Sequence, residues 1–301
     1  LLPGEKWIDR KEQLKWELDS QGYQLTDSRG YQYRFNGLEN KFGYRMVSSI
    51  STRDGFSVIL KYASAGRLVE IISSRGEHIK VDTDDSGRGI CVSIKQDNEE
   101  VKLVRYCYDE QGNMIETIDA LNVSKYFFYK ENHLLIRLVN QGGMSFHWEY
   151  EGNGENARCI HTWGDGGVME YYIHYGKGTT RIRNGENAVT EYFYGSDKLI
   201  YKIIDANGGI TRYRYNASEE LEVIVNPEGY TRKTIYNDFG FPIRITDENG
   251  EDTWLQYDDN YNLTSLRTPE GRQLTWKYDE QDRLASHTTM NGQTIRYSYK
   301  D

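Results

Sequence analysis

The chain has 301 residues, a formal net charge of −9 and 25 tyrosines, while only 37% of its residues are hydrophobic. The acidic balance, with arginines scattered among acidic residues and turns, argues against a nucleic-acid binder, because phosphate neutralisation needs clustered Lys and Arg. No apolar run approaches the length of a membrane-spanning helix. Tyrosine is a strand former with an apolar ring and a polar tip, so this composition favours strands that are half buried and half in water.

Three cysteines, Cys91, Cys107 and Cys159, stand at long and irregular spacings. They fit neither a disulfide framework nor a Cys-x-x-Cys metal site, and we interpret them as ordinary part-buried thiols. The chain begins Leu1-Leu2-Pro3-Gly4, without Met or signal peptide, and ends inside a repeat at Tyr299-Lys300-Asp301. We expect a piece of a longer protein, so the absence of a targeting signal says nothing about its destination.

Residues 1–60 predict a β-rich segment without a clean repeat. Lys15–Leu18, Gln21–Thr26 and Tyr31–Phe35 are short aromatic-rich runs separated by turn residues, as expected for strands. Arg45–Ile50 and Phe56–Tyr62 flank an Asp-Gly turn, which is a strong hairpin signal. The one alternative is a helix over 7–18, where Ile8, Leu14 and Leu18 share a face only poorly.

From residue 61 onward the chain predicts β-hairpin repeats, irregular to about residue 190 and regular from about 191. Arg105–Asp109 and Met114–Asp119 form the first full pair of strands. Tyr129 and Tyr150 are 21 residues apart, and the interval then lengthens to Tyr175 and shortens before the regular series begins. We find no linker, so 61–301 continues directly from the first segment.

The last hundred residues repeat with a period of 21. The period relates two series: Tyr215, Tyr236, Tyr257, Tyr278 and Tyr299; and Gly208, Gly229, Gly250, Gly271 and Gly292. Twenty-one residues are enough for two strands of about seven residues and two short turns, and hence for one antiparallel hairpin.

We therefore expect an all-β antiparallel hairpin repeat. More than twenty strands in one twisted sheet predict a curved sheet or β-spiral, as in the wall of a hollow shell. In the repeat strand Thr211-Arg212-Tyr213-Arg214-Tyr215, alternation places the tyrosines on one face and the arginines on the other. In the second strand Leu263 and Leu266 are three residues apart, which predicts either two partly apolar faces or a bulge.

These repeats resemble the Rhs/YD-repeat family. The resemblance covers roughly residues 60–301, which contain about ten successive copies of the repeat. The motifs that carry it are Thr211-Arg212-Tyr213-Arg214-Tyr215, Asn226-Pro227-Glu228-Gly229, Thr275-Trp276-Lys277-Tyr278, Arg283-Leu284 and the Tyr-Asp pairs Tyr108-Asp109, Tyr257-Asp258 and Tyr278-Asp279.

The resemblance implies a β-spiral that closes into a hollow shell and encloses a C-terminal toxin or cargo domain. The family also includes toxin-complex shells, wall-associated proteins and teneurins. The expected partners are the enclosed cargo and the rest of the shell, with a secretion apparatus or a cell-surface glycan as further partners. The expected location is the exterior or the surface of a bacterium. Bacterial members often end in an Asp-Pro-x-Gly-Leu cleavage motif, which is absent here, so this piece lies upstream of it and no proteolytic role is assigned.

No catalytic set of nucleophile, base and orienting group can be assembled, and we expect neither cofactor nor metal. Asp82 and Asp84 resemble the start of a calcium loop, but Ser93 occupies the place of the required Glu, so an acidic turn is favoured. A hairpin could bring His161, His174 and Asp165 together, although their spacing is not that of metal ligands. The glycine-rich stretch 164–167 is not followed by a predicted helix and reads as a turn.

The row of aromatic residues in the regular repeats can be interpreted either as a structural face or as a ligand-binding surface. These rings could stack on sugars or on a peptide, which would make the chain a carbohydrate- or protein-binding module. Because every repeat carries such residues and a binding site should be local, we favour a packed structural face. The row consists of Tyr213, Tyr215, Trp254, Tyr257, Trp276 and Tyr278.

Overall fold

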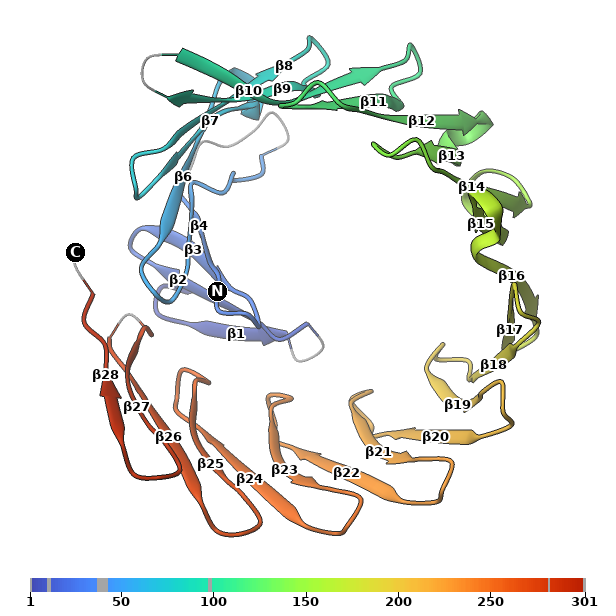
Figure 1. Ribbon diagram of the computed structural model, residues 1–301. Helices are drawn as coiled ribbons and strands as arrows, with labels where there is room; N and C mark the ends of the chain where they lie inside the picture. The colour runs from blue at the N-terminus through green and yellow to red at the C-terminus, as the bar shows by residue number, and fades with distance from the viewer. Residues whose placement is uncertain (1, 10–11, 37–42, 97–98, 281, 300–301) are drawn as a thin grey trace. The chain divides into compact units, whose positions relative to one another are not determined.

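The computed structural model describes residues 2–9, 12–36, 43–96, 99–280 and 282–299; Leu1, Lys300 and Asp301 at the chain ends lie outside it. Within these residues the chain forms 28 strands of one antiparallel sheet and four 3-10 helices of three residues each (Figure 1). The predicted all-β antiparallel hairpin repeat is confirmed. The curvature of the sheet and the hollow shell stay predictions.

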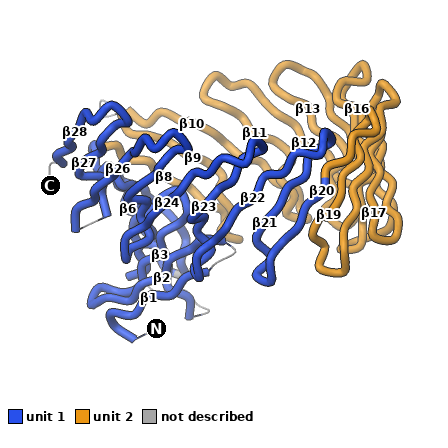
Figure 2. Tube along the Cα trace, turned by 90° about the horizontal axis from the view of Figure 1, so that it is seen from below, with its two compact units in different colours: residues 1–76, 212–301 blue, residues 77–211 orange. Residues whose placement is uncertain are grey.

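The chain divides into two compact units (Figure 2). Unit 1 consists of residues 1–76 and 212–301, and unit 2 of residues 77–211. The predicted domains, 1–60 and 61–301, stay a prediction.

Unit 1 contains the first seven strands and the last eight, all in hairpins between sequence neighbours. The first seven are β1 (Lys6–Asp9), β2 (Leu14–Asp19), β3 (Gly22–Thr26), β4 (Gln32–Phe35), β5 (Ser49–Ser51), β6 (Ser57–Tyr62) and β7 (Leu68–Ser73). The 3-10 helix η1 (Ser64–Gly66) joins β6 to β7. The last eight are β21 (Leu221–Val225), β22 (Thr231–Tyr236), β23 (Pro242–Thr246), β24 (Asp252–Tyr257), β25 (Leu263–Arg267), β26 (Gln273–Tyr278), β27 (Leu284–Thr288) and β28 (Thr294–Arg296).

Unit 2 contains twelve strands, and β20 (Ile210–Tyr215) runs from unit 2 into unit 1. The twelve are β8 (His78–Thr83), β9 (Gly89–Gln96), β10 (Glu99–Tyr108), β11 (Met114–Asp119), β12 (Ser124–Lys130), β13 (Leu134–Val139), β14 (Ser145–Glu151), β15 (Arg158–Gly164), β16 (Val168–Gly176), β17 (Thr179–Asn184), β18 (Val189–Tyr194) and β19 (Ile200–Ile204). Its 3-10 helices are η2 (Glu131–His133), η3 (Gly154–Asn156) and η4 (Asp165–Gly167).

The first segment forms strands, and the helical alternative over 7–18 is wrong. Trp7 pairs with Trp16 in the β1–β2 hairpin, and this cross-strand pairing outweighs the poor helical periodicity. The predicted Asp-Gly hairpin is confirmed as β5–β6, where Gly55 has a φ of 87°. Strand β5 is shorter than predicted because only Ser49–Ser51 pair regularly.

Inside unit 1, the first segment packs on the last repeats. The Gln13 Nε2 amide donates to the carbonyl oxygen of Gly240 at 3.2 Å, and Lys15 Nζ lies 3.4 Å from the Asp282 carboxylate. The Arg53 guanidinium lies 5.9 Å from the centre of the Tyr278 ring. Residues 1–60 therefore interact with the repeats as well as preceding them in sequence.

A bulge in each regular hairpin explains the apolar residues spaced three apart. In β24–β25, Leu255 pairs with Leu266 and Tyr257 pairs with Leu263, with a register shift just before the tyrosine. Thr264 is the extra residue that the bulge accommodates, so Leu263 and Leu266 reach the same face. Of the two predicted explanations, the bulge is therefore the correct one.

The sheet has little closed core. Val223 in β21, at 8% exposure, is the one buried apolar side chain of the described residues. Most strand side chains are half exposed, since a single sheet covers each residue mainly with its neighbours on adjacent strands. Cohesion between hairpins must therefore come from contacts that recur at every repeat, as in other repeat proteins.

Candidate functional site

The repeat tyrosines tie each hairpin to the strand before it. Tyr257, at the end of β24, donates its hydroxyl to the carbonyl oxygen of Pro242, the first residue of β23, at 3.0 Å. The same bond recurs fifteen residues back along the chain in both units. It joins Tyr62 to Val47, Tyr129 to Met114, Tyr150 to Leu135, Tyr194 to Thr179, Tyr236 to Leu221, Tyr278 to Leu263 and Tyr299 to Leu284, at 2.7–3.4 Å.

Burial of the rings perturbs the acidity of these phenols. The protein around Tyr257 disfavours the phenolate and raises the pKa of Tyr257 to about 12. Burial also raises the pKa of other repeat tyrosines, namely Tyr62, Tyr129, Tyr150, Tyr175, Tyr236, Tyr278 and Tyr299. The hydroxyls therefore stay protonated to a higher pH than that of an exposed tyrosine, and each keeps the proton that it donates to the inter-hairpin hydrogen bond.

The aspartate after the tyrosine closes the turn. One carboxylate oxygen of Asp258 accepts the backbone N–H groups of Asn260 at 2.9 Å and Asn262 at 2.8 Å. Tyr261 takes the left-handed position of this turn, with a φ of 65°, and Asn262 is 2% exposed. An Asx turn of this kind needs a short side-chain acceptor, which explains Asp or Asn at this place.

The second turn of each repeat is also an Asx turn, with glycine in the left-handed position. Asp247 accepts backbone N–H groups two and four residues later, at 2.9 Å each, and Gly250 takes the left-handed position with a φ of 83°. The Tyr-Asp pair and the periodic glycines thus have structural roles that the geometry accounts for.

The predicted aromatic row is divided between the two faces of the sheet. Leu255 and Tyr257 face one way, while Trp254, at 47% exposure, faces the other and lies under Arg244 at 5.0 Å. Strand alternation places residues an odd number apart on opposite faces, so grouping Trp254 with Tyr257 was wrong. The other members, Tyr213, Tyr215, Trp276 and Tyr278, lie at half-buried positions.

In unit 2, four rings form a stacked ladder, His147, Trp163, His161 and Tyr172, which the sequence did not reveal. Their centroids are 4.9, 4.2 and 4.1 Å apart with interplanar angles of 11°, 22° and 10°. The guanidinium of Arg183 lies 3.9 Å from the centre of the Tyr172 ring at one end. Cross-strand pairing of β14 to β17 produces the ladder, and the ring faces cover one another.

Carboxylates line the edge of the ladder. His161 Nε2 lies 3.1 Å from Glu170 Oε1, and its Nδ1 lies 3.5 Å from Glu149. Hydrogen bonds from Tyr172 and from His161 lower the pKa of Glu170. The backbone N–H of Ser145, above all, lowers the pKa of Asp165.

The residues weighed as metal ligands do not converge. Asp165 contacts His147 at 3.4 Å, whereas His161 contacts Glu149 and Glu170. Asp84 forms an ion pair with Arg88 at 2.7 Å inside its turn. Within the described ranges, no group of three or more His, Cys, Asp or Glu could hold a metal ion. The glycine-rich stretch 164–167 leads through η4 into β16, as a turn would.

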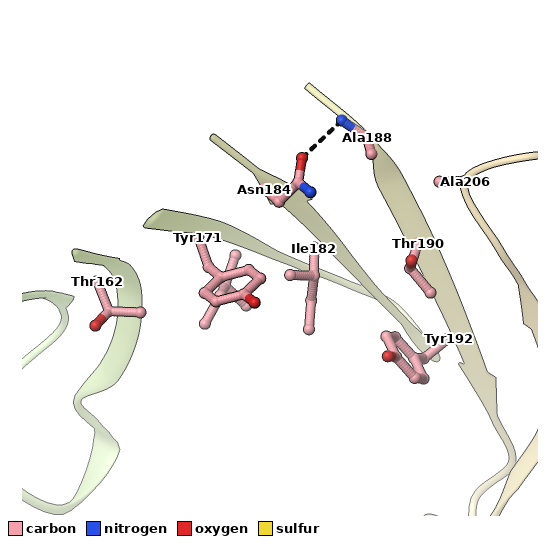
Figure 3. A pocket seen from close by; sticks show the side chains of 9 residues that line it. Thr162, Tyr171, Ile182, Asn184, Ala188, Thr190, Tyr192 and Ala206 are labelled. Atoms are coloured by element: carbon pink, nitrogen blue, oxygen red, sulfur yellow. Dashed lines mark hydrogen bonds between the residues drawn. The ribbon is translucent and has the colours of Figure 1, made fainter. Parts of the chain in front are cut away.

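One face of unit 2 has a hollow across β15 to β18, bounded by Ala206 in the turn after β19 (Figure 3). Its volume is about 450 Å³, within the range of small-ligand sites. Ile182 lies between the rings of Tyr171 and Tyr192, and Thr162 and Thr190 add hydroxyl groups. Asn184 accepts the backbone N–H of Ala188 at 2.8 Å at its upper edge.

The fold defines the class of protein as an antiparallel β-hairpin repeat. Tyrosine hydrogen bonds join its hairpins, Asx turns close them, and several repeats carry a Tyr-Asp pair. Residues 156–301, just under half of the chain, match the family model described as Teneurin YD-shell. The predicted resemblance to the Rhs/YD-repeat family is confirmed. No curated protein matches the chain. In the described part of the chain, none of the helices is long and apolar enough to cross a bilayer.

The chain is also similar to solved toxin-complex structures. The TcdB2-TccC3 crystal structure is 11% identical with a TM-score of 0.38, over 91% of this chain and 21% of that one. TcdB2-TccC3-Cdc42 is 11% identical with a TM-score of 0.39, over 95% and 20%. The Tc holotoxin pore of Photorhabdus luminescens is 12% identical with a TM-score of 0.36, over 88% and 20%. The chain spans about a fifth of the length of these structures.

Proposed function

We propose that the chain is a non-catalytic part of the wall of a YD-repeat shell, which encloses a C-terminal toxin or cargo domain of a secreted bacterial protein. The observation that supports this role most directly is the tyrosine bond between hairpins. Between Tyr62 and Tyr299 it recurs in both units, at a fifteen-residue offset except at Tyr108 and Tyr175, where the offsets are 19 and 16 residues, and it connects successive hairpins. Residues that recur in every hairpin suit a wall better than a local reaction site.

The YD-shell match over residues 156–301 supports the same proposal. The six aromatic residues of the predicted row offer weaker support for a binding module, since Tyr257 and Tyr278 use their hydroxyls within the sheet.

The test is electron microscopy of the protein at its full natural length, with the same protein lacking the region C-terminal to this chain as the matched control. We expect a closed hollow particle that contains density in the first sample and is empty in the second. An extended or solid particle would rule out the shell, and equal internal density in both samples would rule out the enclosed cargo.

A further inference from the structure

Unit 1 contains a cavity between the first segment and the last repeats. Its volume is about 330 Å³, at the small end of the range of ligand sites. Its lining comes from β1 to β3, from the turns after β3 and β5, and from β23 to β25 with the turn between β24 and β25. All these elements belong to unit 1, drawn in blue in Figure 2. We call this space the unit 1 cavity.

Aromatic rings form one part of the lining. Phe241, Tyr257 and Tyr261 line the cavity, and the Phe241 centroid lies 5.3 Å from that of Tyr257 and 5.6 Å from that of Tyr261. The Tyr257 hydroxyl is used in the repeat bond, whereas the Tyr261 hydroxyl has no protein partner in the described chain. One period of 21 residues after Phe241 and Tyr261, polar side chains take their places. The aromatic lining is therefore local to one repeat.

A cation without a carboxylate partner also lines the cavity. Arg53, in the turn between β5 and β6, forms no ion pair or hydrogen bond with the described residues, and its guanidinium contacts the Tyr278 ring. Its side chain crosses the backbone at Gly30, where an added Cβ would lie 2.3 Å from Arg53 Nε. Glycine at this position, with a φ of 85°, therefore leaves the room that the arginine occupies.

The second cation of the lining is already neutralised. Lys15 is 8% exposed, and its Nζ lies 3.4 Å from the carboxylates of both Glu17 and Asp282. Thr26 and Ser28, by contrast, line the cavity with hydroxyl groups that form no hydrogen bond to any described residue. These hydroxyls remain available as donors to a ligand.

The carboxylate in the lining, Asp27, is offset by its own turn. It accepts the backbone N–H groups of Arg29 and Tyr31 at 3.0 Å each and pairs with the Arg29 guanidinium at 3.1 Å. The lining residues are thus left with one uncompensated positive charge, on Arg53. A single guanidinium beside free hydroxyl donors favours a ligand with one negative charge.

The size and charge of the cavity favour a small aromatic carboxylate. A carboxylate accepts two parallel N–H bonds from one guanidinium, which matches the single cation at Arg53. A phosphate monoester carries about 1.5 to 2 negative charges, and the excess charge would lie beside Asp27 without a partner. The small volume admits a ring system rather than a nucleotide or a chain, and an aromatic ring packs well against Phe241 and Tyr261.

We propose that the unit 1 cavity binds a small aromatic carboxylate. The carboxylate pairs with the Arg53 guanidinium and accepts the hydroxyl groups of Thr26 and Ser28, and the ring packs against Phe241 and Tyr261. This site goes beyond the wall role, because a wall needs no small ligand. A chain without the site would still give a hollow particle, so the two proposals fail separately.

The test is calorimetric titration of the complete chain with indole-3-acetate, beside two ligands of similar shape, the neutral indole-3-ethanol and the cationic tryptamine. We expect indole-3-acetate to bind about tenfold more tightly than indole-3-ethanol, equivalent to about 1.4 kcal/mol, and tryptamine not to bind. Arg53→Gln should remove this preference, because it removes the uncompensated cation. Ser28→Ala, which removes one exposed hydroxyl donor, should weaken binding of indole-3-acetate severalfold.

Arg214→Gln is the matched control. Arg214 is also an arginine of unit 1, but its side chain is 68% exposed and pairs with Glu222 outside the cavity. This substitution should leave binding unchanged, and circular dichroism checks that each variant is folded. The comparison of the three ligands on the unchanged chain needs no variant. Absence of saturable binding, equal loss in Arg214→Gln, or equal affinity for indole-3-ethanol or tryptamine would each overturn the proposal.

Discussion

At Tyr257 the ring and the hydroxyl of one side chain contact two different residues. The ring is packed in the hairpin beside Phe241, at 5.3 Å between centroids, and the hydroxyl bonds to the carbonyl oxygen of Pro242. The adjacent Asp258 acts on its own turn only. The Tyr-Asp pair therefore combines one long-range contact with one local contact, which explains why the two residues occur together.

We predict that Tyr257→Phe lowers the free energy of unfolding by about 1 kcal/mol, the usual net contribution of one hydrogen bond, since the ring is retained. Urea denaturation followed by circular dichroism measures the change. Tyr230→Phe is the control because Tyr230 is 57% exposed and its hydroxyl has no protein partner in the described residues. Equal effects of the two substitutions would contradict the role given to the repeat hydroxyl.

At the scale of elements, stacked aromatic rings connect neighbouring strands of unit 2 on the face that carries the ladder. Trp163 lies between His147 and His161 and so connects β14 to β15, and His161 in turn stacks on Tyr172 of β16. These hairpins also contain the interval of 25 residues, where the regular spacing is lost. The stacked rings thus reinforce the irregular part of the repeat.

Trp163→Ala should therefore destabilise unit 2 by about 2–3 kcal/mol, because two ring contacts and their packing disappear. Hydrogen exchange of the amides in β14 to β16 should accelerate, while those in β23 to β26 should not. Trp254→Ala, at an exposed site, is the control and should change exchange in β14 to β16 little. Unchanged exchange in β14 to β16 of the Trp163 variant would show that the ladder is not stabilising.

At the scale of the whole molecule, the repeated phenols make stability depend on alkaline pH. Their pKa values are raised in the folded chain, to about 12 at Tyr257, above the value of about 10 in the unfolded chain. A group with a raised folded pKa contributes stability that is complete below the unfolded pKa and is lost as pH rises through the folded one. Many tyrosines share this property, so their effects accumulate.

We expect the midpoint of thermal unfolding to fall slightly above about pH 8.5, because burial raises the pKa of the Cys107 and Cys159 thiols, and to fall mainly between about pH 10 and 12, where the tyrosines ionise. Phenolate absorbance at 295 nm should rise in the same interval, together with the loss of strand signal in circular dichroism. Most of the decline occurring below pH 10, or tyrosines that ionise while the chain stays fully stable, would contradict this expectation.

Much of this architecture was predictable because period and alternation act locally. The 21-residue spacing of Tyr236 and Tyr257 predicted the hairpin, and Leu263 and Leu266 pointed to the bulge. Strand alternation could also have separated Trp254 from Tyr257, since they are three residues apart before the bulge. The partners of His161 and the hollow on unit 2 depend on the register between irregular strands, and no local pattern specifies that register.

The tyrosine bond also has a direction. Each hydroxyl reaches a carbonyl oxygen earlier in the chain, fifteen residues back in the regular repeats, so the contact is complete without any residue that follows the tyrosine. During synthesis the N-terminal partner has therefore already emerged when its tyrosine appears. The order in which the ribosome supplies hairpins is the order in which each can be fastened to its predecessor.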